Sequence, residues 1–201
     1  MNAVFRKCFL TTLFVIMSDI LQLKITLKDS KPPIWRRVLV NKDATLEDLH
    51  HIIQIAMGWY SSHLWTFESG HESFGPVDGG GMGFEPGDVD DAAAQKIGAL
   101  ASHEKAKFTY TYDMGDSWEH QIVVEKVLSR VPGQQYPFCM DGKLNCPPED
   151  CGGIWGFYNL METLQDPKHP EHKEMKKWIG GKYDPQKFDL AAVNRRLKAE
   201  V

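Results

Sequence analysis

Three of the four cysteines of the chain lie in one short segment that is rich in turn-forming residues. The segment 136–153 holds Cys139, Cys146 and Cys151, and a proline pair and a glycine pair stiffen its second half. Thiolates are soft ligands, and zinc is the metal that such clusters typically bind. The spacing C-x6-C-x4-C lacks the paired C-x2-C knuckles of familiar zinc modules. We therefore predict a zinc site, with a metal-free packed turn and a disulfide as the alternatives.

A structural zinc ion needs a fourth ligand from elsewhere in the chain. We favour His120 or His63 among the eight histidines, and Glu149 and Asp150 are the nearest carboxylates in sequence. A closed site with four protein ligands has no open position for a substrate. This interpretation predicts a noncatalytic binding or adaptor domain with a structural zinc ion.

A second set of donors suggests an open metal site instead. The set consists of His63, Asp113, Asp116, Glu119 and His120. Around one ion with a bound water and a general base, these side chains would form a metal-dependent enzyme. The structural alternatives are turn aspartates that accept backbone hydrogen bonds and a histidine that is hydrogen-bonded in the core.

Length and charge limit the classes of protein. The chain has 201 residues, 42% of them hydrophobic and 25% charged, which is typical of a soluble globular protein with one compact domain. The formal charge is −3 for residues 1–100, −5 for residues 101–167 and +4 for residues 168–201. Only the tail is basic, which argues against a broad nucleic-acid surface, although a basic C-terminal helix could contact phosphate.

Residues 1–18 form a separate N-terminal extension or leader-like segment. A short basic start is followed by an apolar run that is too brief to span a bilayer, and no small-residue cleavage pair follows it. We favour a native start at Met17, with a single domain over residues 19–201, a cytoplasmic location and no membrane partner. A real leader would place the cysteines in an oxidising compartment and favour disulfides.

Alternation of apolar and polar residues predicts the strands. Residues 20–27 and 34–40 form one predicted hairpin across the turn 28–33, and residues 108–112 and 118–125 form a second. A further strand covers residues 64–68 and places His63, Trp65 and Phe67 on one face. In the second hairpin His120 shares a face with apolar side chains.

Helical spacing predicts one helix in the first half of the chain and three near its end. Thr45 and Asp48 form a capping box, from which a helix runs toward Gly58 with His50, His51 and Gln54 largely outside its apolar stripe. The later helices cover residues 154–165, 170–179 and 189–200. Residues 70–91 lie between the predicted strand 64–68 and the second hairpin and form a long loop with a glycine triplet. We predict a flexible linker there, or an acidic lid over a binding site.

Several segments resemble the plasmid pRiA4b ORF-3-like family, some of whose members are labelled TnpR-like transposon passenger proteins. They are Leu23–Leu27, Pro33–Arg37, Leu46–His63, Tyr110-Thr-Tyr-Asp-Met-Gly-Asp-Ser-Trp-Glu-His120, Pro147–Gly153, Asp184–Asp189 and Asn194–Leu197. The resemblance covers nearly everything from Asp19 to Leu197 and implies an α+β fold, without an established activity. Many relatives have His-Leu-His at the His63 position, whereas the third residue here is Trp65.

The sequence as a whole predicts an α+β fold. It consists of an antiparallel sheet built from hairpins, one packed helix in a β-grasp-like order, and a C-terminal helical cluster. The function we expect is a noncatalytic binding or adaptor domain for an unknown protein or small-molecule partner, with zinc as its cofactor. The alternatives are a metal-dependent enzyme with an acidic lid and an accessory protein of a mobile element that contacts nucleic acid.

Overall fold

The computed structural model describes residues 20–77, 84, 87–180 and 183–201. The N-terminal extension and the glycine triplet at 79–81 lie outside these ranges. None of the described helices combines the length and the hydropathy that a bilayer crossing requires.

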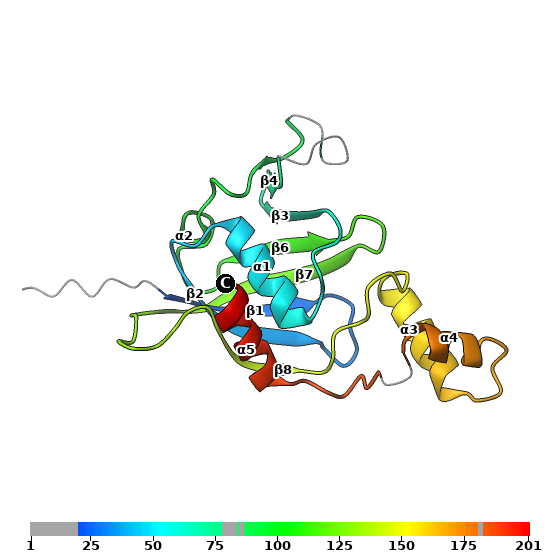
Figure 1. Ribbon diagram of the computed structural model, residues 1–201. Coiled ribbons are helices and arrows are strands. Elements are labelled where there is room, and N and C mark those ends of the chain that lie inside the picture. The colour runs from blue at the N-terminus through cyan, green and yellow to red at the C-terminus, as the bar shows by residue number, and fades with distance from the viewer. Residues whose placement is uncertain (1–19, 78–83, 85–86, 181–182) are drawn as a thin grey trace, which may run out of the picture.

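The described strands form one eight-stranded sheet in the order β5-β4-β3-β6-β7-β1-β2-β8 (Figure 1). The strands are β1 (Ile20–Leu27), β2 (Trp35–Asn41), β3 (Trp65–Ser69), β4 (Glu72–Gly75), β5 (Asp90–Asp91), β6 (Lys107–Tyr112), β7 (Trp118–Leu128) and β8 (Phe138–Lys143). Both predicted hairpins are confirmed, as β1–β2 and β6–β7. The pair β1–β7 joins the two hairpins and is antiparallel, and the pair β4–β5 is parallel.

The helices are α1 (Leu46–Met57), α2 (Ile97–Leu100), α3 (Gly153–Gln165), α4 (His172–Trp178) and α5 (Leu190–Glu200). Helices α1 and α5 lie against one face of the sheet, while α3 and α4 pack together beside the sheet, beyond the turn that joins β6 to β7 (Figure 1). The α+β fold is therefore confirmed, with its three C-terminal helices, of which α3 and α4 pack together and α5 packs on β8 and α1.

The core lies between α1 and the sheet face that it covers. Strand residues Leu23, Ile25 and Ile122 are fully buried there, and so is Leu49 of the helix. The alternation of β1 and β7 accounts for this, because every second side chain points to the same face.

Helix α1 begins with the predicted capping box, in which Thr45 and Asp48 bond each other's backbone amides, and it ends at Gly58 in the left-handed conformation. The expectation that His50 and Gln54 lie outside the apolar stripe is wrong, since both are 2% exposed. Each bonds the buried hydroxyl of Tyr110, at 2.7 Å from His50 Nδ1 and 2.9 Å from Gln54 Nε2. These partners satisfy the polar atoms that burial would otherwise leave unpaired.

Two segments predicted as loops contain strands. Within residues 70–91, the described parts include β4 and β5, which extend the sheet beyond β3. Within the cysteine segment, β8 pairs with β2 and places Cys139 opposite Val38. Cys139 is therefore a buried strand residue rather than part of a turn.

Candidate metal centre at the end of the sheet

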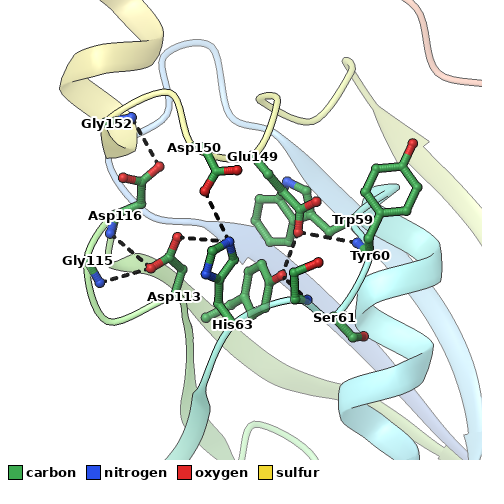
Figure 2. A network of polar contacts seen from close by, with 12 residues as sticks. Trp59, Tyr60, Ser61, His63, Asp113, Gly115, Asp116, Glu149, Asp150 and Gly152 are labelled. Carbon is green, nitrogen blue, oxygen red and sulfur yellow. Dashed lines mark hydrogen bonds and ion pairs between the residues drawn. The ribbon is translucent and has the colours of Figure 1, made fainter. Parts of the chain in front are cut away.

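Three separate chain segments meet at the end of the sheet where β6 turns into β7. They are the residues before β3, the turn 113–117, and the loop 144–152 that leads to α3. His63, Asp113 and Asp150 come one from each segment and point toward one another (Figure 2). His63 Nε2 lies 3.1 Å from Asp150 Oδ1 and 3.7 Å from Asp113 Oδ2.

Among the described residues, this triad is the group of His, Cys, Asp or Glu side chains that could together hold a metal ion. One ligand atom from each residue lies within 4.8 Å of the other two. An imidazole nitrogen and two carboxylate oxygens suit a divalent cation of borderline or hard character, such as Zn²⁺ or Mn²⁺. Without an ion, a protonated imidazole would form ion pairs with the same carboxylates. The geometry thus permits two chemistries, a cation site and a charged hydrogen-bond cluster.

The Asp113 carboxylate is held by its own turn. Asp113 Oδ1 accepts hydrogen bonds from the backbone amides of Gly115 at 2.9 Å and Asp116 at 3.3 Å, which leaves Oδ2 facing His63 (Figure 2). The backbone of Asp113 is left-handed, with φ 59°, and its amide bonds Leu64 O at 2.8 Å. Aspartate tolerates this conformation because its side chain can bond the local backbone.

Asp150 owes its position to the contact between its loop and the turn. Asp116 Oδ2 accepts a hydrogen bond from Gly152 N at 3.1 Å. At Gly153, a Cβ atom would lie 2.3 Å from the carbonyl oxygen of Asp116, so only glycine fits this approach. Asp150 itself has φ 57° and a side chain that is 70% exposed, whereas the Asp113 side chain is 12% exposed.

Neighbouring polar groups fix the same loop from its other side. Glu149 Oε1 accepts hydrogen bonds from the hydroxyl of Tyr112 and, at 3.3 Å, from the backbone amide of Tyr60. Trp59 Nε1 donates to Pro147 O at 2.9 Å. Burial and the contact with Glu149 raise the pKa of Tyr112, which keeps its hydroxyl protonated as a donor.

The structure assembles only part of the open metal set that the sequence suggested. His63 and Asp113 are brought together, and Asp116 lies beside them with one carboxylate oxygen bonded to Gly152. Glu119 belongs to the opposite face of β7 and forms an ion pair with Lys28. His120 is fully buried under α1, as its place in the strand alternation predicted.

The three cysteines of the predicted zinc site lie in strand β8 and in the loop that follows it. Cys139 is in β8, Cys146 is buried in the following loop, and Cys151 is half-buried next to α3. Burial raises the pKa of Cys139 to about 11 and that of Cys151 to about 12, so the described thiols are neutral. Their sulfur atoms do not join a metal-binding group among the described residues. A zinc ion held by these cysteines with His120 or His63 remains a prediction.

A buried arginine occupies the space near two of the cysteines. Arg36 is 1% exposed and donates hydrogen bonds to the carbonyl oxygens of Ala56 and Lys143 at 2.7 and 3.1 Å, with its guanidinium 4.2 Å above the ring of Phe188. Its positive charge acts on Cys139 and Cys146 and lowers their pKa against the larger effect of burial.

Asp150 is the member of the triad that sequence reasoning underrated. The sequence suggests Asp150 only as an additional ligand for the cysteine site, because nothing in the sequence places it near His63. The contact depends on the Asp116–Gly152 hydrogen bond, which joins positions 36 residues apart. The turn-rich composition of residues 147–153 indicates a fixed loop, but it does not indicate that the loop packs against the turn 113–117.

Comparisons with known proteins agree along most of the chain. Residues 19–192 match the family model described as plasmid pRiA4b ORF-3-like protein. The uncharacterized protein y4hQ of Sinorhizobium fredii is 34% identical over 183 residues, which are 90% of this chain and 92% of that protein. The crystal structure of protein of unknown function MM3350 from Methanosarcina mazei Go1 has a TM-score of 0.76 and 32% identity, and covers 86% of this chain and 96% of its own. The resemblance seen in the sequence is therefore confirmed.

Proposed function

Since the chain belongs to the plasmid pRiA4b ORF-3-like family, whose name specifies no reaction, we propose a function from the metal centre itself. The protein is a noncatalytic binding module that holds a divalent cation through His63, Asp113 and Asp150. The observation that carries this proposal is the convergence of the three side chains, with their ligand atoms within 4.8 Å of one another.

The donor set leaves the ion accessible. Three protein ligands fill three of the four to six positions that Zn²⁺ or Mn²⁺ uses, so the remaining positions are free for oxygen atoms of another molecule. His63 is 31% exposed and Asp150 is 70% exposed, so those positions face solvent. The ion would bind a carboxylate, phosphate or carbonyl oxygen of a protein or small-molecule partner.

Binding fits the surroundings better than catalysis. A metal hydrolase needs a general base within hydrogen-bond reach of the bound water. Two neighbouring carboxylates each accept hydrogen bonds through one oxygen, Glu149 from Tyr112 and Asp116 from Gly152. Their hydrogen bonds fix the loop that carries Asp150, which supports a structural role for both.

Isothermal titration calorimetry of chelator-treated protein with Zn²⁺, Mn²⁺ and Mg²⁺ tests the proposal. We expect one ion per chain, and a loss of affinity of about tenfold or more in Asp150→Asn and His63→Gln, because each removes a ligand. Asp43→Asn and His71→Gln are matched controls, since they make the same changes at exposed positions outside the site. They should bind as the parent does.

Two outcomes would overturn the proposal. One is the absence of binding by any of the three ions, and the other is equal affinity in the site variants and the controls. Cys146→Ser and Cys151→Ser distinguish an ion at the His63 triad from a zinc ion held by the cysteines. Zinc that is lost in the cysteine variants but retained in Asp150→Asn would assign the ion to the cysteines.

A further inference from the structure

A cationic groove lies at the other end of β7, away from the metal centre. It has a volume of about 600 Å³ and runs between α5 and the segment 130–138 that joins β7 to β8. Its charged lining side chains are Arg130, Arg195 and Lys198, no aspartate or glutamate side chain lines it, and Val201 with the terminal carboxylate lines it as well. A cationic lining is notable in a chain whose formal net charge is −4.

One wall of the groove is a single face of α5. Ala191, Asn194, Arg195 and Lys198 have the spacing i, i+3, i+4 and i+7, so their side chains project from the same side of the helix. Leu197 anchors the helix to the core with 1% exposure. The two cations therefore stand on a fixed wall, with the small side chain of Ala191 leaving room beside them.

The opposite wall supplies aromatic surface. Tyr136 and Phe138 both line the groove, and Phe138 is 37% exposed. The guanidinium of Arg130 lies 5.1 Å from the centre of the Tyr136 ring and also donates to Asn41. These contacts fix the third cation beside the aromatic wall.

Within the described ranges, the cations of the groove are not held in ion pairs, although Arg130 also borders a neighbouring cavity that Asp43 and Asp48 line. In the part of the chain that the structure describes, Arg130, Arg195 and Lys198 form no ion pair, whereas the adjacent Arg196 pairs with Glu200 at 2.8 Å. Cationic side chains close together repel one another, and an anionic ligand would relieve that repulsion.

We propose that this groove binds a small phosphorylated ligand with a planar ring, of the nucleotide class. Arg195, Lys198 and Arg130 would bind the phosphate oxygens, for which arginine offers bidentate geometry. The ring would stack on Phe138 or Tyr136, as bases do on aromatic side chains. A volume of about 600 Å³ lies within the range of small-molecule pockets. The acidic remainder of the chain disfavours a long nucleic acid.

The test is fluorescence or calorimetric titration with adenosine 5′-diphosphate in the presence of a chelator, on protein with any tag at the N-terminus. Adenosine and inorganic pyrophosphate report the contributions of ring and phosphate separately. We expect Arg195→Gln to weaken binding of the diphosphate by about tenfold, the usual effect of losing a charged hydrogen bond. Arg196→Gln is the matched control, because it removes the same charge one residue away but does not line the groove.

Each outcome has a defined meaning. Loss in Arg195→Gln with retention in Arg196→Gln, together with weaker binding of both adenosine and pyrophosphate, supports the proposal. No binding of the diphosphate, or equal loss in the two arginine variants, overturns it. Pyrophosphate binding as tightly as the diphosphate would show an anion site without ring recognition. An oligothymidylate that binds much more tightly through Arg195 would replace the small ligand with a nucleic acid.

Discussion

His50 and His120 are buried histidines whose protonation opposes folding. Burial lowers the pKa of His50 to about 3 and that of His120 to about 4, with smaller contributions from His51 and Arg36 respectively. The imidazole of an unfolded chain has a pKa of about 6.5. Above that pH both states are neutral, and the free energy of unfolding is unaffected. Below it the unfolded state takes up protons first, so stability falls by up to about 1.4 kcal/mol per pH unit for each histidine until the folded pKa is reached.

We predict that His120→Phe makes the protein less sensitive to acid. Neither ring nitrogen of His120 has a hydrogen-bond partner among the described residues, although the backbone of Trp118 and Tyr110 raises its pKa slightly against the effect of burial. Phenylalanine removes these polar atoms and should fold at least as stably at pH 7.5. In urea unfolding between pH 7 and 5, the variant should lose about 2 kcal/mol less than the parent. His71→Gln, at an exposed position, should follow the parent, and parallel curves for the parent and His120→Phe would show that His120 does not titrate as proposed.

The sequence predicts single residues well where a local pattern decides their environment. Strand alternation predicted His120 in the core, and the predicted turn between the two strands of that hairpin placed Asp113 at the end of the sheet. No local pattern marks Arg36, an arginine on β2 that is 1% exposed because its guanidinium contacts carbonyl oxygens and the Phe188 ring from distant segments. Such compensation of a buried charge is a tertiary property and leaves no local signature.

At the scale of elements, the close contact between the β6–β7 turn and the start of α3 sets the metal centre. We predict that Gly153→Ala weakens ion binding by about tenfold, an effect comparable to the loss of a supporting contact in other metal sites. The new Cβ would lie 2.3 Å from the Asp116 carbonyl oxygen, which is a steric clash with backbone rather than with a flexible side chain. The loop with Asp150 would therefore shift away from His63. Calorimetric titration with Mn²⁺ measures the effect.

Gly70→Ala is the control for the cost of placing alanine in a left-handed backbone conformation. Gly70 has φ +63° and Gly153 has φ +67°, but nothing lies within 4 Å of a Cβ at Gly70. Both substitutions should cost about 1 kcal/mol or more of stability from the left-handed backbone. Only Gly153→Ala should change the ion affinity. Equal affinities in the two variants would mean that this approach does not position Asp150.

The long elements were predictable because they carry their own signals. The capping box marked the start of α1, and alternation marked both hairpins. The short strand β8 was missed because its pairing depends on partners elsewhere. It lies next to β2, and the amide of Asn194 in α5 bonds both the N–H and the C=O of Cys139 at 2.8 Å. This side chain closes part of the free edge of the strand, which no local pattern in residues 138–143 announces.

At the scale of the molecule, the charge distribution along the sequence becomes a separation in space. The acidic middle of the chain supplies Asp113 and Asp150 to one end of β7, and the basic tail supplies Arg195 and Lys198 to the groove near the other end. The proposed cation site and the proposed anion site therefore lie near opposite ends of one strand. The asymmetry seen in the sequence predicted neither site but is the electrostatic basis of both.

We predict that the two sites act independently. Strand β7 has 11 residues, which span roughly 33 Å, and sites so far apart without shared partners usually show additive energetics. Asp150→Asn should therefore bind adenosine 5′-diphosphate within about twofold of the parent, and Arg195→Gln should bind Mn²⁺ within about twofold. Calorimetry of both variants with both probes measures the coupling. A reciprocal loss of about tenfold in the two cross-titrations would instead mean that cation and anion sites are thermodynamically linked, because coupling between two ligands acts equally in both directions.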